Sequence, residues 1–193
     1  MINWFIDNWL ELFGVAVTIA YLFLSIRQSI WLWPLGALSS AIYIAIYFVN
    51  KFYADMGLQT YYLIISIYGF VAWLVHKNRE GKELAVCRTT IKQWLALGVI
   101  TAAIWGALYW ILSEFTDSPV PVGDSFTTAL AITATWMLTR KMIEQWLVFI
   151  VADAVSVALY FTRSMPLTAS LYIIYTTMAV VGFYKWRKEL IQR

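Results

Sequence analysis

The sequence contains very little of what a catalytic or metal-binding site needs. Among its 193 residues there is one cysteine, Cys87, and one histidine, His76. A single cysteine excludes an internal disulfide and a cysteine-rich metal site. The sequence also has no GxSxG, HExxH or glycine-rich phosphate-binding motif. His76 lies beside Lys77 at the predicted end of an apolar stretch, so we expect it to be a solvated loop residue. We therefore expect no enzyme, no cofactor and no metal site.

Charged residues are also scarce. They form 13% of the chain, against about 25% in typical soluble domains. Apolar residues form 62%, and the mean hydropathy is +0.70. This composition is typical of a protein that lies in a lipid bilayer. The net charge of +3 then reflects membrane topology, so we expect no nucleic-acid partner. The length fits a single transmembrane domain over residues 1–193 and leaves no room for a soluble enzyme.

Seven apolar stretches have the length of a transmembrane helix, or nearly so, since about 20 residues are needed. They cover approximately residues 9–26, 30–49, 56–75, 92–112, 123–138, 144–162 and 166–185. The fifth stretch is short and rich in threonine, which suits a helix that faces protein or water. The chain begins with Asp7 and Glu11 where a signal peptide has basic residues, so we interpret the first stretch as part of the fold.

The second half of the chain repeats the first half. A shift of 113 residues places Trp33 on Trp146 without any gap. Other identities at the same shift are Tyr47-Phe48 with Tyr160-Phe161, Tyr62 with Tyr175, Gly69 with Gly182, and Trp73 with Trp186. We expect two three-helix repeats, at about 9–75 and 123–185, joined by a linker helix at about 92–112. Because one helix separates them, the repeats are parallel, and the substrate site of such carriers lies near the midplane between repeats.

The basic residues indicate the orientation in the membrane. If all seven stretches cross, twelve of the fourteen Lys and Arg residues fall on one side, and only Lys51 and Arg163 fall on the other. By the positive-inside rule, the amino terminus is then outside and the carboxyl terminus is in the cytoplasm.

Asp153 is the leading candidate for a substrate-binding residue, because it lies near the middle of the sixth stretch. A charge at the bilayer centre costs about 2.5–3.5 kcal/mol even on the gentler insertion scales, so it needs a cavity or a partner. Trp146 and Phe149 lie seven and four residues earlier, on the same helix face. This set suits a flat organic cation. The alternative is a structural ion pair or a hydrogen bond to a neighbouring helix.

The corresponding positions of the first half carry smaller side chains. The counterparts of Trp146, Phe149 and Asp153 are Trp33, Gly36 and Ser40. Small side chains at Gly36 and Ser40 leave room for an asymmetric ligand, or they allow close helix packing. Both interpretations stay open at this point.

The third and seventh stretches add polar candidates. Gln59 lies about one turn inside the membrane, and its amide both donates and accepts hydrogen bonds, which suits a carboxamide or a hydroxyl group. Tyr62 follows on the same side, and Tyr172 and Tyr175 occupy the positions of Gln59 and Tyr62 in the second half. Tyrosines near a membrane surface are commonly anchors, so for these three either role is open.

Four motifs are spaced through both halves of the chain. They are Trp33-Pro-Leu-Gly36, the segment from Tyr53 to Gln59, Ile67-Tyr68-Gly69 with Trp73, and the segment from Arg140 through Trp146 to Asp153. Together they resemble the Pnu family of vitamin transporters. The resemblance implies a SWEET-like fold and facilitated diffusion of a vitamin, which a cytoplasmic kinase traps by phosphorylation. It also suggests a homotrimer.

The family's motif on the sixth helix is similar to Trp-x-x-Trp followed after three residues by Asn or Asp. Trp146 and Asp153 fit it, and Phe149 replaces the second tryptophan. Relatives carry nicotinamide riboside, thiamine or riboflavin, of which the first two are cations. The resemblance therefore implies uptake of nicotinamide riboside across the cytoplasmic (inner) membrane. Thiamine uptake by the same mechanism, and a proton-coupled transporter that uses Asp153, are the alternatives.

Overall fold

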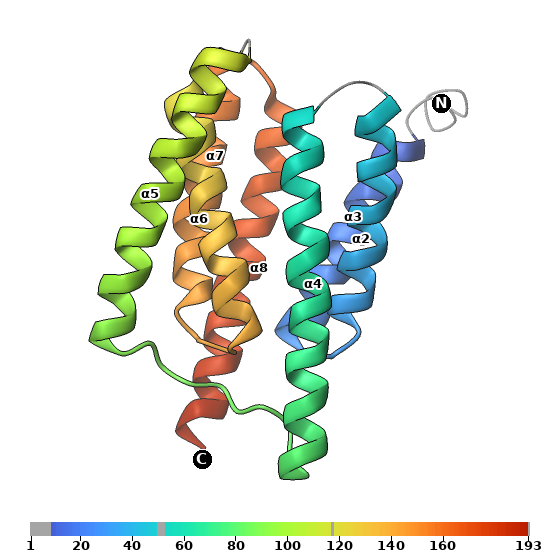
Figure 1. Ribbon diagram of the computed structural model, residues 1–193, viewed down its shortest axis with the longest axis vertical. Coiled ribbons are helices and arrows are strands. Elements are labelled where there is room, and N and C mark those ends of the chain that lie inside the picture. Colours follow the sequence, from blue (N-terminus) through green and yellow to red (C-terminus); the bar gives the residue numbers. More distant parts are fainter. Residues whose placement is uncertain (1–8, 50–52, 117, 193) are drawn as a thin grey trace. The chain divides into compact units, whose positions relative to one another are not determined.

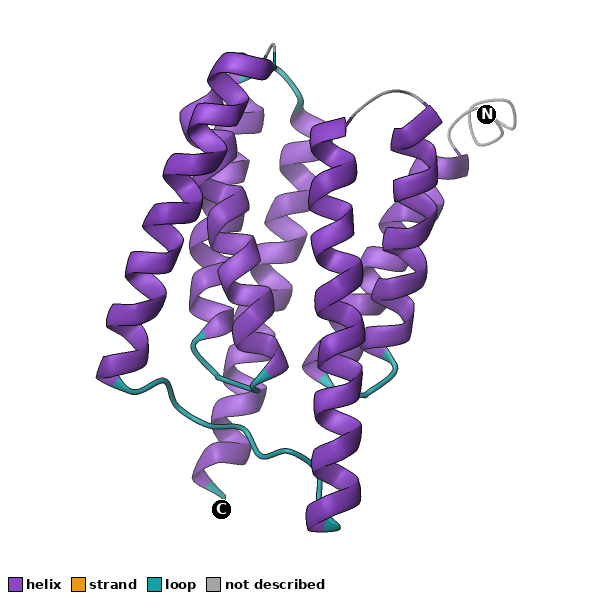
Figure 2. Cartoon of the chain, viewed as in Figure 1, coloured by secondary structure: helices purple, strands orange, loops and turns teal. Residues whose placement is uncertain are grey.

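The computed structural model describes residues 9–49, 53–116 and 118–192, without the side chains of 9–15, 53–55 and 80. Asp7 and Lys51 lie outside the described residues, as does the side chain of Glu11. The elements are α2 (Trp9–Ile26), α3 (Leu32–Val49), α4 (Tyr53–Glu80), α5 (Ile91–Phe115), α6 (Pro121–Thr139), α7 (Gln145–Thr162) and α8 (Pro166–Ile191). Figure 2 shows helices joined by loops throughout this described part, which is all-α.

All seven predicted helices are present, and α4, α5, α6 and α8 are longer than predicted. α4 ends at Glu80 and α8 at Ile191, because Lys, Arg and Glu continue a helix beyond its apolar part. Both α6 and α8 begin with a proline, which needs no hydrogen bond at the first helical position. Among the described residues, α3, α4, α5, α7 and α8 are long and apolar enough to cross a membrane. The threonine-rich α6 is not among them, in line with its weak signal in the sequence.

The chain divides into two compact units, Met1–Glu83 and Leu84–Arg193. In the first unit, α3 packs along α4 and also contacts α2. In the second unit, α5 packs on α6, α6 on α7, and α7 on α8 (Figure 1). The helix predicted as a linker, α5, is therefore an integral part of the second unit.

The helices repeat at the shift found in the sequence. α3 (Leu32–Val49) corresponds to α7 (Gln145–Thr162) at both ends, and α4 and α8 begin at corresponding residues. The turns before α3 and α7 are also alike. Gln28 and Lys141 have φ values of 55° and 51°, although a positive φ is uncommon for residues other than glycine. The same turn is thus built in both units.

A contact between two tryptophans and a glycine joins the last two helices of each unit. The residues are Trp33, Gly69 and Trp73 in the first unit and Trp146, Gly182 and Trp186 in the second. The two indoles of each set meet edge to face, with centroids 5.4 Å and 5.5 Å apart. A Cβ atom on the glycine would lie 2.6 Å or 2.7 Å from the first indole. Only a glycine allows this approach of the ring to the helix.

Three contacts attach α5 to α6. The hydroxyl groups of Thr101 and Thr133 share a hydrogen bond of 2.7 Å. The Trp105 indole N–H donates to the Val122 carbonyl at 3.3 Å, and its ring meets the Phe126 ring edge to face at 5.2 Å. Hydrogen bonds between helices and close ring contacts are the means by which membrane helices associate.

The segment before α5 is held against the turn between α6 and α7. The Cys87 N–H donates to the Lys141 carbonyl, and the Ile143 N–H donates to the Cys87 carbonyl, each at 3.0 Å. One carboxylate oxygen of Glu144 accepts from both the N–H and the hydroxyl of Thr89, each at 2.8 Å. These bonds fix the position at which α5 begins.

Candidate functional site

Three of the predicted site residues come together in the second unit, between α7 and α8. Asp153 is half-buried on α7, and the Tyr172 hydroxyl on α8 lies within electrostatic reach of its carboxylate. The Tyr172 ring also contacts the Tyr175 ring, with centroids 5.6 Å apart and an interplanar angle of 70°. The extensive packing of α7 along α8 brings these side chains together.

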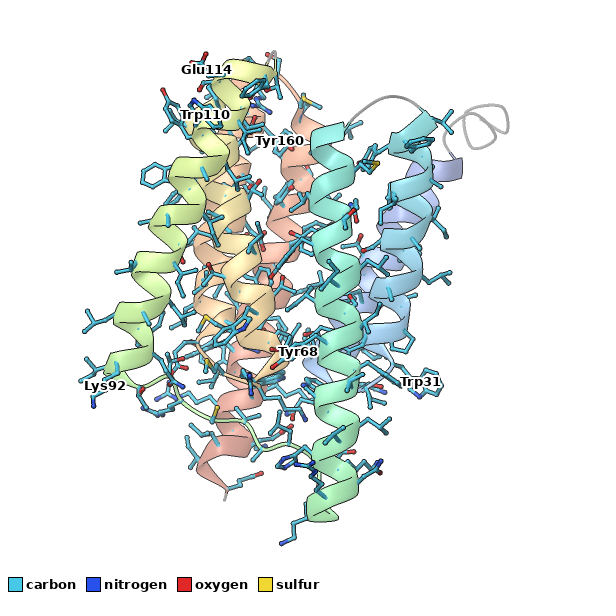
Figure 3. The ribbon with its side chains drawn as sticks, in the orientation of Figure 1. Trp31, Tyr68, Lys92, Trp110, Glu114 and Tyr160 are labelled. Carbon is cyan, nitrogen blue, oxygen red and sulfur yellow. The ribbon has the colours of Figure 1, made fainter. Side chains whose placement is uncertain are left out.

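Tyr160 belongs to the same group, although the sequence analysis did not select it. Its ring stacks on Tyr172 at 5.2 Å and 18°, and the two hydroxyl groups share a hydrogen bond. Tyr160 follows Asp153 by seven residues, so the two share a helix face, and this spacing was the signal available in the sequence. In Figure 3 it lies near the end of the second unit that carries Glu114. We refer to Asp153, Tyr160, Tyr172 and Tyr175 as the tyrosine cluster.

Trp146 and Phe149 make their contacts with different elements. Trp146 is 1% exposed and packs against Gly182 and Trp186 of α8. Phe149 packs against a buried apolar cluster from α5, α6 and α7 that includes Ala134. Because the first unit contains the same tryptophan–glycine contact, the contact of Trp146 belongs to the fold that both units share. The contact of Phe149 has no equivalent in the first unit, where the corresponding residue is Gly36.

In the first unit, the position that corresponds to Phe149 is Gly36, and other side chains fill the space beside it. A Cβ atom on Gly36 would lie 3.0 Å from the Ser66 Oγ and 3.1 Å from the Tyr21 ring. The counterpart of Tyr21 at the 113-residue shift is Ala134. In the first unit the large side chain is Tyr21 and the small residue is Gly36. In the second unit the large side chain is Phe149 and the small residue is Ala134. The small residue Gly36 therefore allows the Tyr21 ring and the Ser66 side chain to pack closely against α3.

Three tyrosine hydroxyl groups lie near one another in the first unit. The Tyr21 hydroxyl lies within electrostatic reach of those of Tyr61 and Tyr62, whose rings are 5.5 Å apart. Ser40 is 5% exposed on α3, and Gln59 is half-buried on α4. Sequence reasoning missed Tyr21, whose only signal was a tyrosine paired with an alanine in the repeat.

The two units therefore offer different chemistry. The tyrosine cluster combines a carboxylate with aromatic rings, which suits an organic cation. The group around Gly36 offers hydroxyl groups, which donate and accept hydrogen bonds. Among the described residues, no three His, Cys, Asp or Glu side chains are placed to hold a metal ion.

Comparison with known proteins identifies the family. Residues 8–188 match the family described as nicotinamide mononucleotide transporter. The chain belongs to this family. Among its relatives, the nicotinamide riboside transporter PnuC of Escherichia coli is 23% identical over 96% of this chain and 88% of the relative. PnuC of Neisseria mucosa is 25% identical over 97% of this chain and 74% of the relative. The riboflavin/roseoflavin transporter RibM of Streptomyces davaonensis is 23% identical over 92% and 84%.

One solved structure shares the fold. The crystal structure of the vitamin B3 transporter PnuC superimposes with a TM-score of 0.74, at 23% identity, over 96% of this chain and 83% of that one. The members of this family are transporters, and the apolar helices identify a protein that crosses the inner membrane several times. The protein is a transporter and not an enzyme, as the sequence predicted.

Proposed function

We propose that this protein carries nicotinamide riboside across the cytoplasmic membrane by facilitated diffusion. A cytoplasmic kinase then traps the vitamin by phosphorylation. The tyrosine cluster is the main support for this proposal, because Asp153 and the rings of Tyr172 and Tyr175 suit a flat pyridinium cation. The PnuC relatives, which are nicotinamide riboside transporters, support the same substrate.

Each proposed site residue has a separate part in binding. Asp153 neutralises the pyridinium charge, and Tyr172 and Tyr175 stack on the ring. Trp146 and Phe149 support α7 behind the carboxylate. We also propose Gln59, Tyr62 and Ser40 as substrate-binding residues, because an amide and hydroxyl groups suit a carboxamide and ribose hydroxyl groups. Tyr21 adds a further hydroxyl beside Tyr62.

The arrangement we propose is SWEET-like, with two parallel three-helix repeats and a substrate near the midplane. The repeated helix ends and the repeated turns support it. We further propose that the amino terminus is outside, that the carboxyl terminus is in the cytoplasm, and that the lipid-embedded protein is a homotrimer. Within the second unit, Lys92 and Glu114 lie at opposite ends of α5 (Figure 3), which agrees with this orientation.

Riboflavin is a second candidate substrate, because RibM is among the relatives. It is uncharged and does not need the carboxylate of Asp153. Thiamine is a thiazolium cation of similar charge to nicotinamide riboside, so it is the alternative substrate for the same mechanism.

Calorimetric titration of the purified protein with the three vitamins tests the proposal. We expect nicotinamide riboside to bind, and Asp153→Asn to weaken this binding by about 10- to 100-fold, the cost of a charged contact. Glu114→Gln is the matched control, because it removes an exposed carboxylate from the same unit. Equal affinity in the wild type and Asp153→Asn, or binding of riboflavin alone, contradicts the proposal.

Liposomes that contain only the purified protein test the mechanism. Facilitated diffusion predicts that labelled nicotinamide riboside reaches equal concentrations on both sides. It also predicts that dissipating a pH gradient leaves the initial rate unchanged. A rate that falls when the gradient is removed would instead support a proton-coupled transporter that uses Asp153.

A further inference from the structure

An ion pair lies at the end of the second unit, beside the tyrosine cluster. The Arg163 guanidinium, just after α7, donates to the Asp124 carboxylate at the start of α6 at 2.6 Å. The same carboxylate oxygen accepts from the Ser118 hydroxyl at 2.8 Å. The Arg163 and Asp124 side chains are only 19% and 30% exposed. Two charges with this little exposure interact more strongly than a pair on an open surface.

The arginine is also in contact with the tyrosine cluster. Its guanidinium lies over the Tyr160 ring, 5.7 Å from the centroid, and Tyr160 stacks on Tyr172. Tyr172 is within electrostatic reach of Asp153. A row of neighbouring groups therefore runs from the Asp124 carboxylate to the Asp153 carboxylate. Between them lie the Arg163 guanidinium and the rings of Tyr160 and Tyr172.

The first half does not have this charge pattern. The counterparts of Arg163 and Asp153 in the sequence are Asn50 and Ser40. The positive charge at the end of the row thus occurs in the half that also has the carboxylate. Without a negatively charged partner, an arginine in this position would repel a cationic substrate bound at Asp153.

We propose that Asp124 is a positioning residue that sets charge selectivity. By pairing with Arg163, it cancels the positive charge over Tyr160, so that the tyrosine cluster accepts a positively charged ring. This inference rests on the proposed function, because it takes the substrate to be a cation held at Asp153. It concerns residues that do not touch the substrate themselves.

The expected effect follows from the spacing along α7. Arg163 follows Asp153 by ten residues, a rise of about 15 Å. At an effective dielectric constant of about 20, a unit charge at this distance changes the affinity for a cation about sixfold. Asp124→Asn should therefore raise the Kd for nicotinamide riboside about sixfold. Arg163→Gln should lower the Kd by a similar factor, because it leaves the negative charge of Asp124 uncancelled, and the double variant should resemble the wild type.

A purely structural role of the ion pair predicts a different pattern, because both single variants break the same contact. Equal weakening by Asp124→Asn and Arg163→Gln would overturn the proposal. So would a double variant that binds as poorly as Asp124→Asn. The salt dependence gives an independent readout, since the Debye length falls from about 30 Å at 0.01 M to about 3 Å at 1 M. The difference between Asp124→Asn and the wild type must shrink over this range.

Calorimetric titration in detergent measures all four proteins, after gel filtration has shown that each is folded. If Asp124→Asn does not fold, Arg163→Lys replaces it, because this variant keeps the charge while Arg163→Gln removes it. The proposal then requires tighter binding by Arg163→Gln than by Arg163→Lys. Wild-type protein that binds no nicotinamide riboside would overturn the proposed function and this inference together. Wild-type binding with equal Kd values in all variants would overturn this inference alone.

Discussion

The tryptophan–glycine contact gives a direct test of how the last two helices of each unit pack. We consider Gly182→Ala, which adds one methyl group to α8. Its carbon would lie 2.7 Å from atoms of the six-membered ring of the Trp146 indole. The indole cannot move aside freely, because the edge-to-face contact with Trp186 restricts it. The helices must therefore separate or the ring must leave its preferred position.

Overpacking of this kind costs typically about 1–3 kcal/mol. For a chain of 150–250 residues, this corresponds to a fall of roughly 2–12 °C in the unfolding midpoint. Gly106→Ala is the matched control, because no atom lies within 4 Å of a Cβ at this position of α5. There the substitution should leave the midpoint unchanged or raise it, since alanine favours a helix by roughly 0.5–1 kcal/mol over glycine.

Thermal unfolding in detergent, followed by tryptophan fluorescence, compares the two variants. Gly69→Ala should behave like Gly182→Ala, since its Cβ atom would lie 2.6 Å from Trp33. Equal midpoints for Gly182→Ala and Gly106→Ala would refute the reasoning. So would destabilisation at Gly182 without destabilisation at Gly69, because the two contacts have the same geometry.

Three further predictions concern the second unit. Glu144→Ala removes the acceptor of both Thr89 donors and should cost about 1–3 kcal/mol in thermal unfolding. Glu144→Gln, which keeps an oxygen, should cost less, and equal losses would contradict this. Burial, and then the negative charge of Glu144, raise the pKa of the Cys87 thiol. Glu144→Gln should therefore lower this pKa and speed the alkylation of Cys87 by iodoacetamide at about pH 8, just below the ordinary thiol pKa. An unchanged rate would exclude the electrostatic effect. Thr101→Val removes the bond to Thr133 and should lower the free energy of unfolding by only about 0.6 kcal/mol, the average for such bonds in membranes; a much larger loss would show that this bond holds α5 in place.

The helices could be predicted from the sequence because apolar length alone marks a membrane-spanning segment. The place of α5 could not be predicted in this way. Its attachment to α6 depends on Thr101, Thr133 and Trp105, and hydropathy does not show which of these side chains meet. The position of the segment before α5 likewise depends on backbone hydrogen bonds to the distant turn between α6 and α7.

The candidate site could likewise be predicted only in part from the sequence. Asp153 was identifiable because a carboxylate in the bilayer needs an explanation, and the repeat pointed to Tyr172 and Tyr175. Tyr160 and Tyr21 were missed, because a tyrosine in an apolar stretch is commonly an interfacial anchor. Their roles depend on the neighbours that the fold provides, namely the stacked Tyr172 ring and the small residue Gly36.

The bonds that hold the segment before α5 have a consequence for biosynthesis. Thr89 and its partner Glu144 are 55 residues apart in sequence. At a synthesis rate of about 5–20 residues per second, the ribosome needs roughly 3–11 s to make the intervening chain. During this time α5 is inserted without its anchor. A nascent chain stopped before residue 140 also lacks the negative charge of Glu144, so its Cys87 should be alkylated faster than that of the finished protein.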